Sequence, residues 1–164
     1  MKRDAEDFLK EKEVLKELEK NNFEFEILGS LYFDLMYDLA DIDIKVKSKN
    51  IFDDSKKFFN LFVDKKKFQK MEYGNFIDFP RKNRPKGCIV NLRTEFRNKK
   101  WEIEIWFVDE ENFNQSVLER DEIYKKINSK NKEKILILKD KRLREGKDKN
   151  NLSSWEIYKE VLGF

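Results

Sequence analysis

Histidine is absent from this chain of 164 residues, and Cys88 is its only cysteine. Without histidine, the chain cannot form a Ser-His-Asp or Cys-His nucleophilic site, a histidine metal cluster or a histidine general base. A single cysteine excludes an intrachain disulfide and a cysteine-rich zinc site. Any chemistry must therefore use carboxylates, lysines, hydroxyls and metals with oxygen ligands. Hard cations such as Mg²⁺ or Mn²⁺ suit that set of ligands.

The sequence also lacks the features of a membrane protein. No apolar run approaches the ~20 residues of a membrane-spanning helix, and the first residues contain no signal-peptide core. We therefore expect a cytoplasmic protein with no membrane partner. Charged residues make up 42% of the chain but the net charge is only +3, which indicates a surface of mixed sign rather than a uniformly basic coat.

The length fits one domain with a substantial core. The apolar patterning predicts an α+β fold, in which a small mixed or antiparallel β-sheet is flanked by helices and the C-terminus is helical. We expect a core over residues 1–110 and a helical extension over residues 111–164. The N-terminal half is expected to contain helices over 4–20 and 31–38 and strands over 23–28 and 41–47.

A helix that starts at Asp53 is expected to continue to near Tyr73 and to stop at Gly74. Two strand-like runs follow, over 88–96 and 101–108, and residues 97–100 between them predict a hairpin. From about residue 115 the pattern is helical, with a break near Gly146 and a restart at Ser153.

The stretch from Gly29 to Asp43 contains the most informative candidate residues for a functional site. Strand side chains alternate between faces, so Asp41 and Asp43 point one way and the isoleucines between and after them point the other. Unpaired buried carboxylates are very unfavourable, so the aspartate face must be wet, paired or metal-bound. Carboxylates about 7 Å apart along a strand can share two divalent ions roughly 3.5–4 Å apart. The Gly29-Ser30 turn before them suits a nucleotide phosphate.

A third carboxylate is expected from the run 101–106, in which Glu102 and Glu104 share a face. If this strand lies beside strand 41–47, one glutamate comes within about 5 Å of the aspartates. It would complete a metal shell and could accept a proton from an attacking hydroxyl. We favour Glu104 because it is central in the run, whereas Glu102 is nearer the turn. The alternative is that both are exposed strand positions.

These residues resemble the signature of the polymerase-beta-like nucleotidyltransferase superfamily. The pattern is Gly29-Ser30, a short helix, Asp41-Ile42-Asp43-Ile44 and a later acidic strand, with Leu28 at the opening apolar position. The run Trp101-Glu102-Ile103-Glu104-Ile105-Trp106 is also similar to small bacterial members, and Glu104 falls on their third catalytic carboxylate. The resemblance covers residues 23–108. The chain departs from it at Ala40, where many members have Ser or Thr, and at Asp34 or Leu35, where many have glycine.

The resemblance implies transfer of a nucleoside monophosphate from a nucleoside triphosphate such as ATP. Asp41, Asp43 and Glu104 would be the catalytic residues and would hold two Mg²⁺ or Mn²⁺ ions. Gly29 and Ser30 would hold the phosphates. The acceptor stays open among a small hydroxylated molecule, an RNA 3′ end and a protein hydroxyl, and the oligomeric state is equally open.

Further cations are candidates for the nucleotide site. Arg81, Arg84 and Lys86 lie in a basic loop bounded by prolines and could hold the triphosphate or the leaving pyrophosphate. Lys45 shares the aspartate face. The alternative for each is an ordinary solvated side chain. The basic segment 120–149 is interpreted as a solvated helical face rather than a nucleic-acid footprint.

Two other functions compete with the enzyme. The first is a nucleotide-binding or interaction module of the same fold without turnover, which the altered short helix favours. The second is an RNA-binding protein that acts through its basic C-terminal region.

Overall fold

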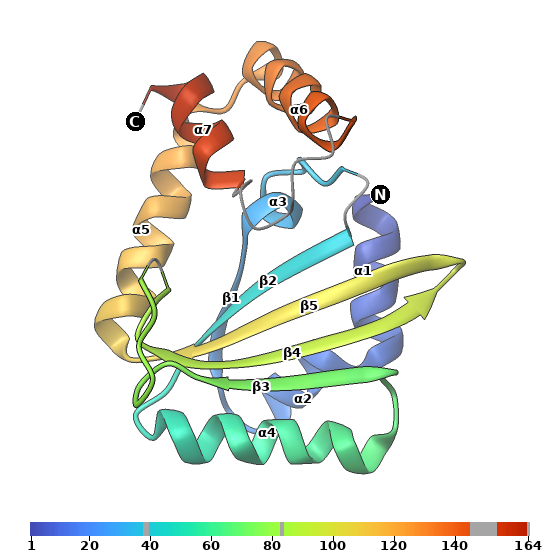
Figure 1. Cartoon of the computed structure of the whole chain (residues 1–164), viewed down its shortest axis with the longest axis vertical. Helices are drawn as coiled ribbons and strands as arrows, with labels where there is room; N and C mark the ends of the chain where they lie inside the picture. Colours follow the sequence, from blue (N-terminus) through green and yellow to red (C-terminus); the bar gives the residue numbers. More distant parts are fainter. Residues whose placement is uncertain (38–39, 83, 145–153, 164) are drawn as a thin grey trace.

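The computed structural model describes residues 1–37, 40–82, 84–144 and 154–163. At its centre is a five-stranded sheet with the strand order β1-β2-β5-β4-β3 (Figure 1). The strands are β1 (Glu24–Leu28), β2 (Ala40–Lys47), β3 (Lys70–Asn75), β4 (Gly87–Phe96) and β5 (Lys99–Val108). β2 and β5 run parallel, and the other three pairs are antiparallel. The predicted mixed α+β fold is therefore confirmed.

Seven helices lie around the sheet in the part of the chain that the structure describes. They are α1 (Lys2–Lys12), α2 (Val14–Lys20), α3 (Gly29–Tyr32), α4 (Ile51–Lys65), α5 (Glu110–Lys126), α6 (Ser129–Arg144) and α7 (Ser154–Leu162). α4 crosses the foot of the molecule, whereas α6 and α7 lie at the opposite end, above α3 (Figure 1). No helix among the described residues is both long and apolar enough to cross a membrane.

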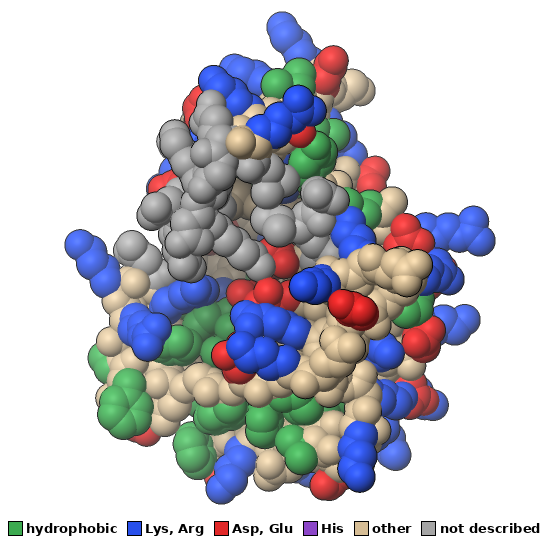
Figure 2. Space-filling view, turned by 45° about the vertical axis from the view of Figure 1, so that its right-hand side comes forward, with side chains coloured by type: hydrophobic (Ala, Val, Ile, Leu, Met, Phe, Trp, Pro, Cys, Tyr) green, Lys and Arg blue, Asp and Glu red, His purple; other side chains and the backbone are tan. Residues whose placement is uncertain are grey.

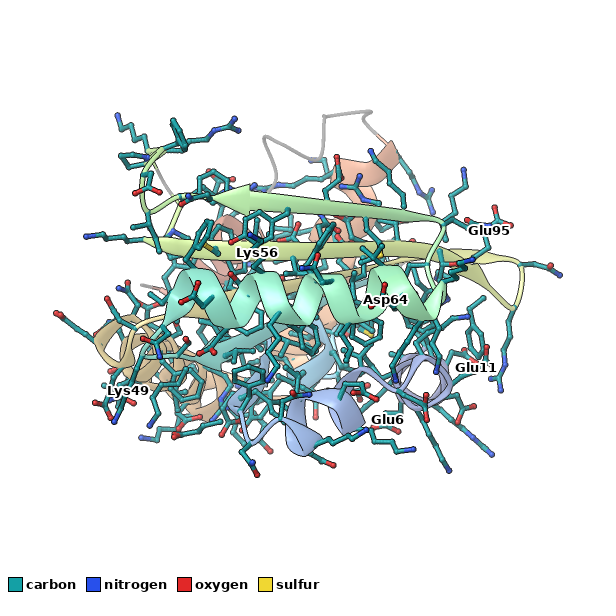
Figure 3. All side chains as sticks on the ribbon, turned by 90° about the horizontal axis from the view of Figure 1, so that it is seen from below. Glu6, Glu11, Lys49, Lys56, Asp64 and Glu95 are labelled. Carbon is teal, nitrogen blue, oxygen red and sulfur yellow. The ribbon has the colours of Figure 1, made fainter. Side chains whose placement is uncertain are left out.

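One face of the sheet carries the main core. Ile42, Ile44 and Val46 of β2 are buried there, as expected from the alternation of side chains along a strand. Phe8 of α1 and Phe58 of α4 belong to the same cluster. Charged positions of α4 such as Lys56 and Asp64 are exposed (Figure 3). Because helices seal this face, the aspartates of β2 are left on the opposite one.

A second, smaller core joins the C-terminal helices to the turn after β1. It contains Phe33 and Leu35, which follow α3, together with Ile123 of α5, Ile135 of α6 and Ile157 of α7. The C-terminal helices are thereby fixed against the segment that leads from β1 to β2. This packing brings residues from the end of the chain next to the predicted phosphate turn.

Three predicted boundaries were wrong. The first helix is divided at Glu13, whose φ of 58° is left-handed. The helix expected over 31–38 is the short α3, which begins at Gly29. The helix from Asp53 was expected to reach Tyr73, but α4 ends at Lys65 and Lys66 takes a left-handed φ of 51°.

Residues that were assigned to the end of that long helix form a strand instead. β3 pairs with β4 through Lys70–Asn75, so Gly74 lies inside a strand and stops no helix. The hairpin over 88–96 and 101–108 is confirmed, with Arg97 and Asn98 at its turn. A break between α5 and α6 was not predicted, and the expected break at Gly146 and restart at Ser153 lie outside the described residues.

Candidate active site

The polar face of β2 faces away from the main core. Asp41, Asp43 and Lys45 are partly exposed on it, and they alternate with the buried Ile42 and Ile44. This alternation follows from strand geometry, in which successive side chains point to opposite faces. The sequence pattern alone therefore carries two carboxylates and one ammonium group to the same surface.

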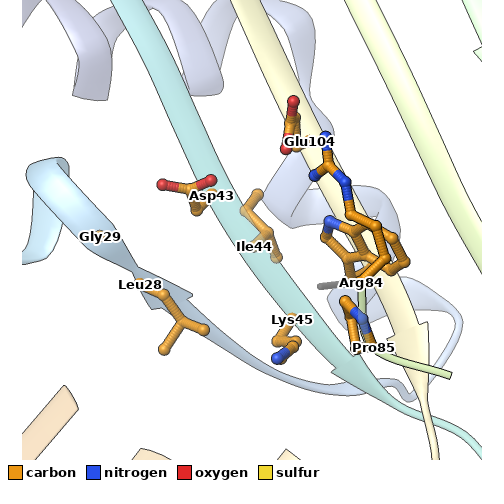
Figure 4. Close-up of a pocket in the computed structure, with 9 residues that line it drawn as sticks. Leu28, Gly29, Asp43, Ile44, Lys45, Arg84, Pro85 and Glu104 are labelled. Carbon is orange, nitrogen blue, oxygen red and sulfur yellow. The ribbon is translucent and has the colours of Figure 1, made fainter. Parts of the chain in front are cut away.

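The parallel pairing of β2 with β5 sets which glutamates stand beside them. Asp43 pairs with Glu104, and Asp41 pairs with Glu102. Neighbouring strands lie about 4.8 Å apart, so side chains at paired positions on one face are near neighbours. Figure 4 shows Asp43 and Glu104 rising from adjacent strands on the same side of the sheet. Four carboxylates thus come from two consecutive same-face positions on each of the two strands.

The two glutamates have different surroundings. Oε1 of Glu102 accepts hydrogen bonds from Asn91 Nδ2 at 2.7 Å and from Arg93 Nη2 at 2.8 Å. Arg93 also binds Glu72 on β3, with 2.6 Å between Nη1 and Oε2. Glu102 is therefore tied into a network that extends to the far edge of the sheet. Glu104 instead lines the cleft beside Asp43.

Gly29 packs directly against one of the carboxylates. Its φ of +63° is left-handed, and a Cβ placed on it would overlap Oδ2 of Asp43 and lie 3.2 Å from Cγ. Any other residue would therefore be strained in its backbone and would displace the carboxylate. The glycine of the Gly29-Ser30 turn is required by this close approach.

A cleft of about 270 Å³ opens over these residues (Figure 4). Its lining consists of Leu28, Gly29, Asp43, Ile44, Lys45, Arg84, Pro85, Glu104 and Trp106. Five of the residues predicted for the site are among them. The lining does not include Ser30, Asp41, Arg81 or Lys86. In Figure 4 the guanidinium of Arg84 extends toward Glu104, and it stacks over Trp106 at 5.9 Å from the ring centroid.

Lys45 reaches α5 at the lower end of the cleft, where its Nζ donates a hydrogen bond to Ser116 Oγ. Burial lowers the pKa of Lys45, and the negative charges of Glu119 and Asp43 partly oppose that change. The ammonium is thereby held at one position beside the acidic residues. Such a fixed cation suits a phosphate contact better than a freely solvated lysine does.

Lys139 lies at the predicted phosphate turn, although the sequence did not reveal this position. Its Nζ donates hydrogen bonds to Ser30 Oγ at 2.7 Å and to the Leu35 carbonyl at 2.9 Å. The hydroxyl of Tyr158 on α7 lies 3.3 Å from Ser30 Oγ. Burial lowers the pKa of Lys139 to about 8, although the charges of Asp43 and Asp41 act to raise it. A cation from α6 is thus held at the predicted phosphate turn.

Lys139 also corrects the interpretation of the basic segment 120–149 as a solvated face, because this lysine points inward. The surrounding Lys134 and Lys141 are exposed, as expected. Local sequence carries no signal for the difference, since the partner Ser30 is 109 positions away.

The donor set suits Mg²⁺ or Mn²⁺ chemically, because it consists of carboxylate oxygens on the wet face of a rigid sheet. Because Gly29 has no Cβ, the space beside its backbone is left for the carboxylate of Asp43. In their present rotamers, however, the described residues contain no group of three or more Asp, Glu, Cys or His side chains arranged to hold a metal ion. The register of β2 and β5 places the carboxylates at neighbouring positions. Their side chains would have to rotate to coordinate a metal ion.

Comparison with known proteins gives a result at the level of the fold. No family model matches the sequence, and no curated protein matches it. Among solved structures, the Cid1 poly(U) polymerase bound to MgATP superposes with a TM-score of 0.68 at 16% identity, and covers 95% of this chain and 48% of that one. Cid1 with the UTP analog UMPNPP gives a TM-score of 0.60 at 16% identity, with 95% and 47% covered.

A third structure, of a cytoplasmic RNA terminal U-transferase, gives a TM-score of 0.65 at 17% identity and covers 95% of this chain and 46% of that one. The chain thus spans about half the length of these proteins. At such identities the likeness is one of fold. The chain has the fold of the polymerase-beta-like nucleotidyltransferases, as its Gly29-Ser30 and Asp41-Ile42-Asp43-Ile44 pattern predicted.

Proposed function

We propose that this protein is a metal-dependent nucleotidyltransferase that transfers a nucleoside monophosphate from a nucleoside triphosphate to a hydroxyl acceptor. The observation that carries the proposal is the pairing of Asp43 with Glu104 across β2 and β5, beside Gly29 in one cleft. Carboxylates at neighbouring strand positions repel one another, so their placement beside one cleft favours a site that binds a cation. We also propose a cytoplasmic location, on the sequence grounds given above.

Asp41, Asp43 and Glu104 would hold Mg²⁺ or Mn²⁺. Bound there, the ions would neutralise the phosphate charge and stabilise the charge that develops during transfer. The protein's own contribution is positioning. β2 and β5 fix the backbone of the carboxylates, and the packing of Gly29 against Asp43 fixes one of them further.

Fixed cations around the acidic residues would bind the triphosphate. Gly29 and Ser30 form the turn, Lys139 donates to the Ser30 hydroxyl, and Lys45 is held by Ser116. Arg84 is the loop residue best placed to contact the triphosphate or the leaving pyrophosphate, because it lines the cleft and Arg81 and Lys86 do not. Positive charge at these positions stabilises the transferring phosphoryl group.

The reaction would form a bond between the acceptor oxygen and the α-phosphorus and break the bond from that phosphorus to the bridging oxygen, so that pyrophosphate leaves. The acceptor hydroxyl loses its proton as it attacks. Glu104 is proposed to take that proton, because it lies in the cleft beside Asp43 and a carboxylate so placed can act as a general base. The helical extension over 111–164, beside the core over 1–110, would help to enclose the acceptor.

The test is incubation of the purified protein with Mg²⁺ and each labelled nucleoside triphosphate, with and without RNA, small hydroxylated acceptors and protein acceptors. Pyrophosphate release that is lost in Asp43→Asn supports the proposal. Lys56→Gln on the outer side of α4 is the matched control and should retain the activity. Absence of Mg²⁺-dependent nucleotide binding by calorimetry would refute the proposal.

A second candidate is a nucleotide-binding module of the same fold that does not turn over its ligand. The observation in its favour is that no metal-binding group is assembled among the described side chains. Tight binding of a Mg²⁺-nucleotide with no pyrophosphate release on any acceptor, by the protein and by Asp43→Asn alike, would select this candidate.

A further inference from the structure

The loop between β3 and β4 combines basic and aromatic side chains at the rim of the cleft. Over its described residues, 76–82 and 84–86, it carries four cations and one carboxylate. The cations are Arg81, Lys82, Arg84 and Lys86. None of them has an ion-pair partner among the described residues. The single carboxylate, Asp78, accepts a hydrogen bond from Asn75 Nδ2 at 2.8 Å.

The base of the loop is held in a defined conformation. The amide of Phe76 donates to the Gly87 carbonyl at 2.9 Å, and Asn75 Oδ1 accepts from the amides of Ile77 and Asp78 at 3.0 and 3.2 Å. The guanidinium of Arg81 and the rings of Phe76 and Trp106 lie next to one another in and beside the loop. Arg81 lies 5.5 Å from the centre of the Phe76 ring, and that ring lies 5.3 Å from Trp106 with 30° between the planes.

At the outer end of the loop, Phe79 is 73% exposed, more than any other large hydrophobic residue in the described chain. Single exposed apolar residues are common on protein surfaces, so the exposure of Phe79 becomes informative through the cations Arg81 and Lys82 that follow it in the same loop. At the inner end, Arg84 and Pro85 line the cleft together with Asp43 and Glu104. The loop thus connects an exposed ring with the acidic centre.

We propose that this loop binds a single-stranded nucleic acid, with Phe79 stacked on a base and Arg81 and Lys82 at the backbone phosphates. Single strands are bound by this combination of aromatic platforms and a cationic track. A small hydroxylated acceptor would need neither an exposed ring nor cations that lie outside the lining of the cleft. Figure 2 shows acidic side chains in the middle of one face with Lys and Arg side chains around them, so this face carries charges of both signs. The inference rests on the proposed function only in taking the bound strand to be the acceptor.

The test measures fluorescence anisotropy of a labelled single-stranded RNA of about 15 nucleotides, a length that covers the usual site sizes, without nucleotide or divalent metal. Phe79→Ala should weaken binding roughly tenfold, within the range for the loss of one base stack. The double variant Arg81→Gln/Lys82→Gln should lower the slope of log affinity against log salt by about 1.4, since each single-strand phosphate contact contributes about 0.7.

The matched controls lie on α4. Phe52 is exposed at 44%, so Phe52→Ala removes an exposed ring outside the loop, and Lys56→Gln/Lys57→Gln removes two exposed cations. Both should bind RNA as the unmodified protein does. Circular dichroism of every variant, with an unchanged thermal transition, separates loss of the site from loss of folding.

Three results would overturn the inference: equal RNA affinity of Phe79→Ala and the unmodified protein, equal affinity for a duplex of the same length, or binding of anionic phospholipid vesicles but not of RNA. Pyrophosphate release is measured in parallel. RNA binding that depends on Phe79 without any release would refute the proposed function and leave the loop site standing. Pyrophosphate release with small acceptors, without RNA binding, would support the proposed function and refute the loop site.

Discussion

The carboxylate of Asp43 occupies the space that a side chain at Gly29 would need. Gly29 takes the left-handed φ of +63° that a residue with a Cβ rarely adopts, and its ideal Cβ would overlap Oδ2 of Asp43. The two residues also lie at the same end of the β1–β2 pair, where Leu28 is the register partner of Asp43. The Gly-Ser turn and the first acidic strand are therefore one packed unit.

Gly29→Ala should lower the rate of pyrophosphate release by about 100-fold, because a displacement of about 1 Å at a reacting centre has an effect of that size. The matched control is Gly163→Ala. Gly163 has a similar φ of +70° but no atom within 4 Å of its ideal Cβ. Both variants carry a backbone strain of about 1 kcal/mol, so only the first should lose activity. Equal turnover by the two variants would show that the Gly29–Asp43 packing is unimportant.

The surroundings of the two glutamates on β5 predict unequal effects. Glu104→Gln should lower kcat by about 100-fold or more, the usual effect of removing a general base. Glu102→Gln should lower kcat by less than about tenfold. This substitution should cost about 1 kcal/mol of stability, because it weakens the charged hydrogen bond with the half-exposed Arg93. Steady-state kinetics and urea unfolding of both variants measure the two quantities. A larger loss of kcat in Glu102→Gln would assign the catalytic role to that residue instead.

Arg84 and Lys86 belong to one loop but differ in their relation to the cleft. Arg84→Ala should raise the Kd for the triphosphate by about tenfold, the effect of losing a charged contact. Lys86→Ala should change this Kd by less than about threefold, because Lys86 does not line the cleft. Calorimetric titration with a non-hydrolysable triphosphate gives both values. The reverse order would mean that the loop changes its conformation on binding.

The local features of the fold were predictable where the spacing of apolar residues along the chain indicates the secondary structure. Alternation in β2 identified the face that carries Asp41 and Asp43, and the apolar residues between them did enter the core. The expected helix was wrong at Met71 and Tyr73, which are more buried than Lys70 and Glu72 in the alternation of a strand. The phenylalanines of α4 have a helical spacing, and that spacing does not continue past the left-handed Lys66. A chain reversal at a non-glycine residue leaves no strong mark in the sequence.

The long-range features were harder to predict. That β5 would lie beside β2 followed from the resemblance rather than from any property of the two segments. The difference between Glu102 and Glu104 depends on Arg93 and Asn91, which come from a third strand. Lys139 looks like its neighbours in a lysine-rich helix. Its role depends on contacts with Ser30 and Tyr158, and such contacts arise only when the two cores assemble.

Lys139 gives the proposed site a dependence on pH. Burial lowers the pKa of its ammonium to about 8, so the free protein carries this cation below pH 8 and loses it as the pH rises. Triphosphate affinity should therefore fall above about pH 8, approaching tenfold per pH unit if the contact is essential. A bound triphosphate stabilises the charged form and moves the midpoint of the fall upward.

Two substitutions isolate this effect, measured by calorimetry between about pH 7 and pH 9.5. Lys139→Arg keeps its charge throughout the range and should abolish the fall. Lys139→Met lacks the charge at every pH, so it should bind the triphosphate about tenfold more weakly at pH 7 and show no fall. Lys134→Met, at an exposed position of the same helix, should behave like the unmodified protein. If Lys139→Met bound as tightly as the unmodified protein at pH 7, the lysine would be a structural link between α6 and the turn rather than a phosphate contact.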